Sequence, residues 1–246
     1  MSDPGPLSTD AATPSNGVKA HRRLRPDWLS DDLAYILPMG AFLLFTWAGA
    51  QWPSLFAASY AAKTVIAAGL LVFLWPHYTK VRWNYWWLGV VMGVLGLVQW
   101  VGMEKLLIYF WPNFPEITGE PRDLTKVFAS PTVAWSFIVL RWAGATLVVP
   151  FMEELFWRDF LWRTVAAPAD FRLASIGEWD RGLPLLAVAA AFCVVHPQWL
   201  TAFTWGLMIG WLLLYTRSLG ACIVMHAVTN FLLGLYVLVT GDWRFW

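Results

Sequence analysis

Apolar residues in this chain are gathered into blocks, several of them close to the length that crosses a lipid bilayer. Hydrophobic residues make up 59% of the 246 positions and charged residues 13%, against roughly 45–50% and about 25% in soluble domains. A spanning helix needs about 20 apolar residues, because the hydrocarbon layer is about 30 Å thick. The pattern predicts an all-α polytopic transmembrane helix bundle of seven or eight spans. The expected spans are 33–52, 61–76, 83–103, 131–149, 151–166, 183–196, 199–216 and 219–240.

The first 30 residues are polar and rich in Pro, Ser and Asp. We expect a disordered cytoplasmic tail over 1–30, no cleavable signal peptide, and a single transmembrane domain over 31–246. Basic residues precede the first block and follow the second, which indicates a multi-pass protein of the cell (inner) membrane with a cytoplasmic N-terminus. Pro and Gly mark two polar connections, about 104–130 and 167–182, as loops.

Charge and cysteine content exclude several other classes. The net charge is +1, which provides no basic surface for nucleic acid, so the lipid bilayer is the partner that composition predicts. Cys193 and Cys222 both lie inside apolar blocks, and we expect no disulfide framework. Many of the 19 Trp residues stand near block edges, where the headgroup layer favours them.

Two adjacent acids, Glu153 and Glu154, interrupt an apolar stretch just after Pro150. Because proline disfavours a continuing helix, we expect a new helix to start there with both acids in its first turn. Glu154 and Arg158 are four residues apart and can form an ion pair. Glu153 is then left over, and an unpaired carboxylate in a low-dielectric pocket can accept a proton from water. Alternatively, both acids lock helices together through Arg158, Arg141 or Arg163.

Further polar groups enter the later blocks. His196 ends an apolar run, where a lone histidine is usually an interfacial hydrogen bonder, and His226 and Asn230 share a helix face, where they could simply join helices. Arg141 has no local acid, and its role is left open. Together with the glutamates, these side chains provide what is needed to activate water and stabilise an oxyanion.

Three motifs in order resemble those of the type II CAAX prenyl endopeptidases and their bacterial relatives, the CPBP (ABI) membrane proteases. The motifs are Glu153-Glu154-Leu-Phe-Trp-Arg158, Phe192-Cys-Val-Val-His196 and His226-Ala-Val-Thr-Asn230. The resemblance covers about 131–240. The run from Leu140 to Pro150 looks most like the CAAX prenyl protease-related subgroup that accompanies exosortase sorting systems, which implies a link to such a system.

The resemblance implies an intramembrane endopeptidase. Glu153 and His196 would activate a water, His226 and Asn230 would donate to the oxyanion, and Glu154 would orient Glu153 and pair with Arg158, with Phe192 in support. No cofactor is favoured. The alternative is a zinc site made of Glu153, His196 and His226.

The sequence leaves open the identity of the substrate and the class of protein. A membrane-embedded peptide or protein end, such as a lipidated or sorted C-terminal tail, is the expected substrate. A non-proteolytic scaffold or immunity protein is one rival, and a transporter is another, although no paired repeat supports it. The spacing also presents a difficulty, because a single span separates His196 from His226. They can meet only if His226 lies well inside its helix, and seven helical residues from Leu219 rise about 10 Å.

Overall fold

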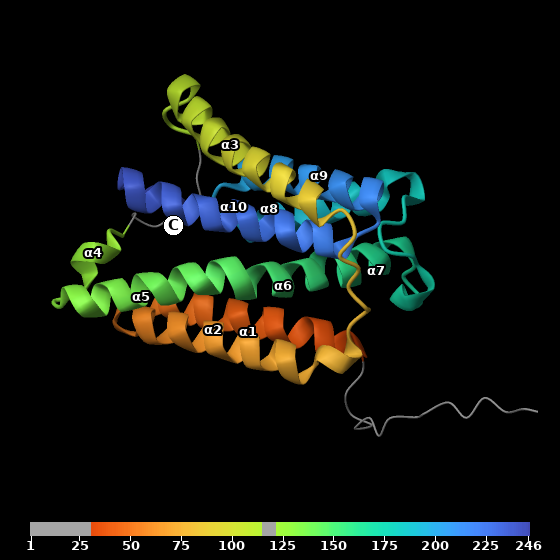
Figure 1. Ribbon diagram of the computed structural model, residues 1–246, viewed down its shortest axis with the longest axis horizontal. Helices are drawn as coiled ribbons and strands as arrows, with labels where there is room; N and C mark the ends of the chain where they lie inside the picture. The colour runs from red at the N-terminus through yellow and green to blue at the C-terminus, as the bar shows by residue number, and fades with distance from the viewer. Residues whose placement is uncertain (1–30, 115–121) are drawn as a thin grey trace, which may run out of the picture.

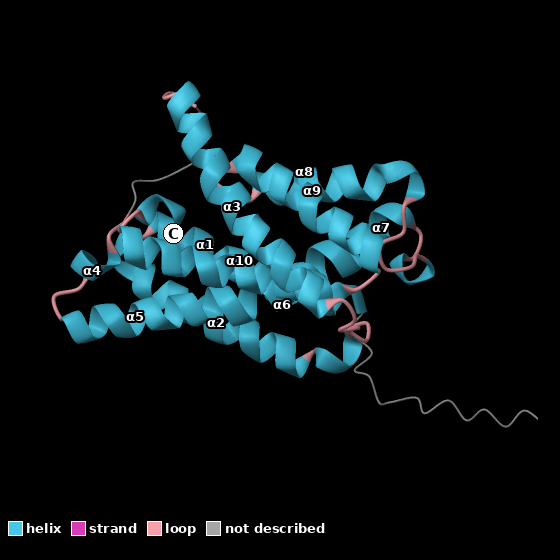
Figure 2. Ribbon diagram, turned by 45° about the horizontal axis from the view of Figure 1, so that its top comes forward, coloured by secondary structure: helices cyan, strands magenta, loops and turns pink. Residues whose placement is uncertain are grey.

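The computed structural model describes residues 31–114 and 122–246, and all regular secondary structure in these ranges is helical (Figure 2). The predicted all-α class is therefore confirmed, whereas the predicted tail, 1–30, lies outside the described residues. The α-helices are α1 (Asp31–Gln51), α2 (Phe56–Phe73), α3 (Trp86–Phe110), α4 (Leu124–Val127), α5 (Pro131–Ala143), α6 (Val149–Glu154), α7 (Trp162–Ala166), α8 (Leu183–Val194), α9 (Trp199–Thr216) and α10 (Leu219–Thr240). The 3₁₀ turns are Pro53–Leu55, Trp75–His77, Phe171–Leu173, Asp180–Gly182 and Trp243–Phe245.

Six segments of the described chain, rather than seven or eight, are long and apolar enough to cross a membrane: Asp31–Gln51, Pro53–Phe73, Trp86–Phe110, Pro131–Ala166, Trp199–Thr216 and Leu219–Thr240. The difference comes from two places. The predicted spans 131–149 and 151–166 are one segment, and α8 has only 12 residues, about 18 Å of helix against about 30 Å of hydrocarbon. The predicted loop at 104 is also wrong, because α3 continues to Phe110.

The expected helix start at Pro150 is wrong. Helical structure runs without interruption from Pro131 to Ala166, and Pro150 lies inside it. A π-helical turn, Gly144–Val148, precedes the proline and another, Leu155–Leu161, follows the glutamates. Proline removes one backbone donor and crowds the carbonyl four residues before it, and the wider π turn accommodates this defect. The two glutamates therefore lie mid-helix, so the helix-dipole argument does not apply to them.

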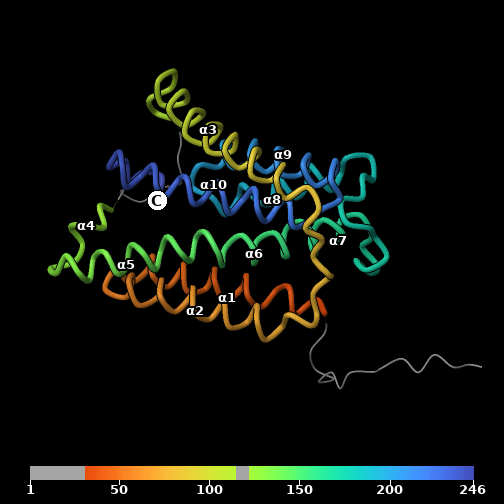
Figure 3. The backbone as a smooth tube through the Cα atoms, viewed as in Figure 1, coloured from red at the N-terminus to blue at the C-terminus, as the bar shows by residue number. Residues whose placement is uncertain are grey.

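The long helix α5–α6–α7 lies between the α1–α2 pair and the group formed by α10, α3, α8 and α9 (Figures 1 and 3). Helices α3 and α10 make the closest contact, because Gly89 and Gly93 face α10 without side chains. Thr229 Oγ1 donates to the Gly93 carbonyl at 3.0 Å across this contact. Small residues four apart allow such backbone approach in membrane helices.

The connections meet at two ends of the bundle. At the N-terminal end, defined by the start of α1, the Asp159 carboxylate accepts hydrogen bonds from Tyr35 (2.8 Å) and Arg163 (2.7 Å), and Ser218 Oγ donates to the Arg82 carbonyl at 2.9 Å. These contacts join α1, α7 and the connections 74–85 and 217–218. At the opposite end, called the far end here, lie the start of α2, α4 and the segment 241–246 (Figure 1).

Candidate active site

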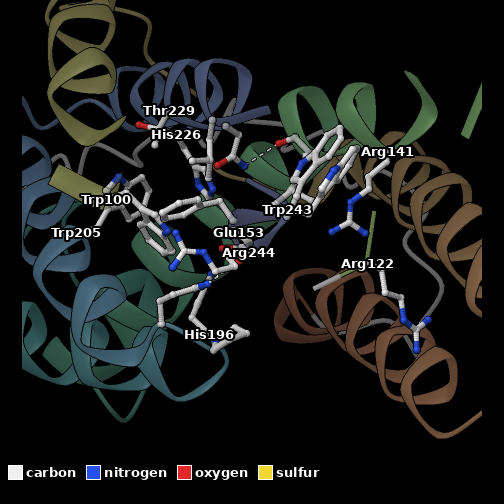
Figure 4. Close-up of a pocket in the computed structure, with 18 of the residues that line it drawn as sticks. Trp100, Arg122, Arg141, Glu153, His196, Trp205, His226, Thr229, Trp243 and Arg244 are labelled. Carbon is white, nitrogen blue, oxygen red and sulfur yellow. Dashed lines mark hydrogen bonds between the residues drawn. The ribbon is translucent and has the colours of Figure 1, made fainter. Parts of the chain in front are cut away.

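A cavity of about 610 Å³ lies between the long helix, α8, α9 and α10. Its wall includes the side chains of Glu153, His196 and His226, which Figure 4 labels. Asn230 and Phe192 also line it. These residues come from three segments that are distant in the sequence. Both histidines line the same cavity, so the topological difficulty is resolved: α8 is too short to cross, and His226 is the eighth residue of α10.

Glu154 lies behind the cavity wall and is fully buried. Its Oε1 atom accepts from Arg158 Nη1 at 3.2 Å and from His226 Nδ1 at 2.8 Å. The ion pair expected from the four-residue spacing is therefore present. The bond to His226 was not anticipated, because nothing in the sequence connects position 154 with position 226. Since a carboxylate can only accept, Nδ1 of His226 carries the proton and Nε2 is left for a ligand.

His196 is held in the same manner by a different acceptor. Its Nδ1 atom lies 2.8 Å from the Phe192 carbonyl oxygen, one helical turn earlier. Its ring stacks on the Phe192 ring with a centroid separation of 4.1 Å. A carbonyl oxygen can only accept, so Nδ1 donates and the lone pair of Nε2 is available. The spacing of four residues in the second motif thus has a structural reason, because Phe192 orients the His196 imidazole through both its ring and its carbonyl.

Glu153 is 7% exposed, and its Oε2 atom is buried with no hydrogen-bond partner among the described residues. It forms no ion pair within that part of the chain, in contrast to Glu154. A carboxylate oxygen without a donor in a cavity of this kind is positioned to accept a hydrogen bond from water or substrate.

Asn230 follows His226 by one helical turn and lines the cavity. Its Nδ2 atom donates to the carbonyl of Ala145 at 2.8 Å. Ala145 lies in the π turn before Pro150, so the irregular helix contributes a carbonyl that holds the carboxamide. A side-chain amide has two N–H donors, and one therefore remains for a ligand.

No group of three His, Cys, Asp or Glu side chains in the described ranges lies in an arrangement that could hold a metal ion. Glu153, His196 and His226 are not placed as such a group, and the zinc alternative stays a prediction. Cys193 and Cys222 are both free thiols.

Residues 134–232 match the model of the Rce1-like family of type II CAAX prenyl endopeptidases. The matched segment runs from α5 into α10 and contains every residue of the three motifs. An Rce1-like domain suggests an intramembrane protease, a hydrolase with a protein substrate. The exosortase-associated subgroup stays a prediction. No curated protein and no solved structure matches the chain.

Several cavity residues were missed by sequence reasoning. Trp205 contacts the His226 ring edge-on at a centroid distance of 4.9 Å, and Trp100 contacts His196 at 6.0 Å. The interfacial position was predicted for tryptophans near block edges, and the burial of Trp100 and Trp205 distinguishes these two from them. Arg122 and Arg244 also line the cavity from outside the matched segment. No local pattern indicated them, because each comes from a polar connection.

Proposed function

We propose that this protein is an intramembrane endopeptidase that hydrolyses a peptide bond of a membrane-associated protein with a water activated by Glu153 and His196. The observation that carries the proposal is the arrangement of one cavity: a carboxylate without a partner lies in it with two imidazoles, each held through Nδ1. The similarity of residues 134–232 to an endopeptidase family supports the same conclusion.

In the proposed reaction, Glu153 and Nε2 of His196 accept hydrogen bonds from a water molecule. Glu153 takes one proton from the water as its oxygen attacks the scissile carbonyl. When the tetrahedral intermediate collapses, the C–N bond breaks and Glu153 returns that proton to the leaving amine. The remaining N–H of Asn230 donates to the oxyanion. His226 joins it when Nε2 is protonated, and Glu154 stabilises that imidazolium through Nδ1. Arg158 balances the Glu154 charge. Glu154 thus orients His226 rather than Glu153.

The protein is a multi-pass membrane protein by its six candidate spans. We propose that its N-terminus is cytoplasmic, as the basic residues before the first span indicate. The substrate would enter from the bilayer as a peptide or protein tail, with or without a lipid.

The test compares the terminal peptides of the membrane proteome in cells that carry the wild-type chain or Glu153→Ala as their sole copy. We expect new protein termini in the wild-type membranes that are absent with Glu153→Ala. Asp32→Ala removes an exposed acid outside the cavity and is the matched control. It should keep the wild-type termini.

Equal amounts of protein and equal elution volumes in size-exclusion chromatography would establish that both variants fold. Identical termini in all three strains, with a biological effect that persists in Glu153→Ala, would refute the peptidase and favour a scaffold. Metal content of the chelator-treated protein, measured beside its activity, tests the same proposal, which requires full activity without a bound metal.

A further inference from the structure

The cavity contains positive charge that the proposed hydrolysis does not use. Arg122, Arg141 and Arg244 line it, and Glu153 is the single acid among the lining residues of the described chain. Figure 4 shows Arg122 and Arg141 on one side of the cavity, with His196, Trp100 and Trp205 on the other. Arg122 and Arg141 therefore form a cationic end that is separate from the histidines, whereas Arg244 is drawn beside Glu153.

Arg141 is the informative residue of the three. Its Nε atom is buried and has no hydrogen-bond partner in the described ranges. Its guanidinium lies 4.7 Å from the Tyr60 ring centroid and 5.5 Å from that of Trp246. Arg244 differs, because the Asp242 carboxylate accepts two hydrogen bonds from it.

Arg122 is exposed at the far end, with its guanidinium 4.8 Å from the Phe56 ring centroid. Neither Arg122 nor Arg141 forms an ion pair with an acid of the described chain. An unpaired cation within a spanning segment is costly, and such residues mark substrate sites. Two aromatic faces hold the Arg141 guanidinium in a fixed plane, and its planar fork matches a carboxylate.

Because this cation shares one cavity with Glu153, a single ligand can reach both. We propose that Arg141, assisted by Arg122, binds the free C-terminal carboxylate of the peptide that is cleaved. This inference rests on the proposed function and adds the side chains that hold the free carboxylate of the tail.

The spacing predicts the length of the released tail. Arg141 and Glu153 are 12 positions apart in one continuous helical segment that includes the π turn Gly144–Val148. They are therefore separated by at most about 18 Å along the helix axis at 1.5 Å per residue. An extended peptide advances about 3.3 Å per residue, so at most about five residues separate the carboxylate from the scissile bond.

The experiment measures binding to the inactive variant Glu153→Gln, purified as the full chain in detergent. The probes are synthetic decapeptides with apolar C-terminal halves, each prepared as a free acid and as a C-terminal amide. We expect the acid to bind about 10- to 100-fold more tightly than its amide, as a charge-assisted fork would provide. Adding Arg141→Gln should bring that ratio near one, and Arg141→Lys should restore part of it.

Arg172→Gln is the control, because Arg172 is an exposed arginine of the N-terminal end that does not line the cavity. Its acid-to-amide ratio should stay at the value of Glu153→Gln alone. Equal binding of acid and amide would overturn the proposal. Equally tight binding of amides that carry an internal Asp or Glu would also overturn it, since the arginines would then bind a side chain. Displacement of both peptide forms by phosphatidylglycerol would do the same, since the arginines would then bind a lipid headgroup.

Cleavage distinguishes the two proposals. If the chain with Glu153 intact cleaves acid and amide equally, the peptidase stands and the carboxylate site falls. If the chain cleaves neither peptide but still binds the acid more tightly than the amide, the carboxylate site stands and the peptidase falls.

A second observation concerns the side of the membrane on which the cavity opens. The wall residues Phe56, Leu124 and Trp246 all belong to the far end of the bundle. Basic residues of the described connections are concentrated at the opposite, N-terminal end, with five against three at the far end. They are Lys80, Arg82, Arg172, Arg181 and Arg217 at the N-terminal end, and Arg122, Lys126 and Arg244 at the far end.

Lys and Arg accumulate in cytoplasmic connections. We infer that the cavity opens on the side of the membrane away from the cytoplasm. Substrate tails would then reach it from that side.

Cysteine labelling tests this orientation independently of activity. In a chain with Cys193 and Cys222 replaced by serine, Val127→Cys places a thiol at the far end and Leu173→Cys places one at the N-terminal end. Both positions are exposed. In sealed right-side-out vesicles, a membrane-impermeant maleimide should label Val127→Cys, and it should label Leu173→Cys only after permeabilisation. The opposite pattern would overturn the inference.

Discussion

Gly93→Ala tests the contact between α3 and α10. A Cβ atom at position 93 would lie 2.6 Å from Val228 Cβ and 2.8 Å from the Met225 carbonyl oxygen. Distances below 3 Å do not occur between real atoms of these kinds, so something has to move. The carbonyl belongs to the α10 backbone and cannot rotate away. The two helices must therefore move apart. His226 is adjacent to Met225 on α10, so its position changes as well.

The expected cost follows from two opposing effects. Overpacking a tight contact costs about 1–3 kcal/mol, and two clashes place this case near the upper limit. Alanine improves helix propensity over glycine by about 1 kcal/mol. The net loss in the free energy of unfolding is therefore about 2 kcal/mol, which corresponds to about 4–8 °C in Tm for a chain of this size.

The assay is thermal unfolding of the full chain in detergent micelles, followed by intrinsic tryptophan fluorescence. Gly102→Ala is the matched control, because it lies in the same helix and a Cβ there meets nothing within 4 Å. It should unfold at the wild-type temperature or slightly above. If Gly93→Ala unfolds as high as Gly102→Ala, the contact is not as close as described and the reasoning is refuted.

Three further outcomes are expected. Glu154→Gln should reduce the yield of monodisperse protein in size-exclusion chromatography, because removing one partner of a buried ion pair costs about 3–5 kcal/mol, and adding Arg158→Met should recover part of that yield. His196→Ala should lower substrate cleavage about 10²- to 10⁴-fold with little change in Tm, and parallel losses of both would argue for a structural role. Hydrogen bonds from Arg244 hold the pKa of Asp242 below its ordinary value, so the stability that this pair adds is present above that value and is lost as pH falls through the lowered pKa. The Tm difference between the wild type and Asp242→Asn should therefore be constant above about pH 5 and disappear in stronger acid, and a difference that persists there would contradict this assignment.

Spacing along the sequence was enough to predict part of the site. The ion pair between Glu154 and Arg158 and the shared face of His226 and Asn230 follow from the four-residue period of a helix, and both are present. The choice of Glu153 as the unpaired acid followed from counting one arginine for two carboxylates. These inferences were correct because they depend on neighbours within one helix.

The wrong predictions concern residues whose unfavourable local features are compensated by partners that are distant in the sequence. Pro150 was expected to start a helix, but the π turn before it accommodates the missing donor, and Asn230 from α10 bonds the carbonyl of Ala145 in that turn. Glu104 was expected at the start of a loop that Pro and Gly mark, yet it is buried in α3 with Thr201 of α9 donating to it. In each case the partner is about 85 or more positions away.

By itself, the sequence determined that the chain spans a membrane and which polar residues are unfavourable in contact with lipid, because hydrophobicity and helical periodicity are local properties. Only the tertiary structure decided which of them share a cavity, that Glu154 holds His226, and that Arg141 faces the same space as Glu153. Those relations depend on how α5, α8 and α10 pack, and packing is set by side chains that are far apart in the sequence.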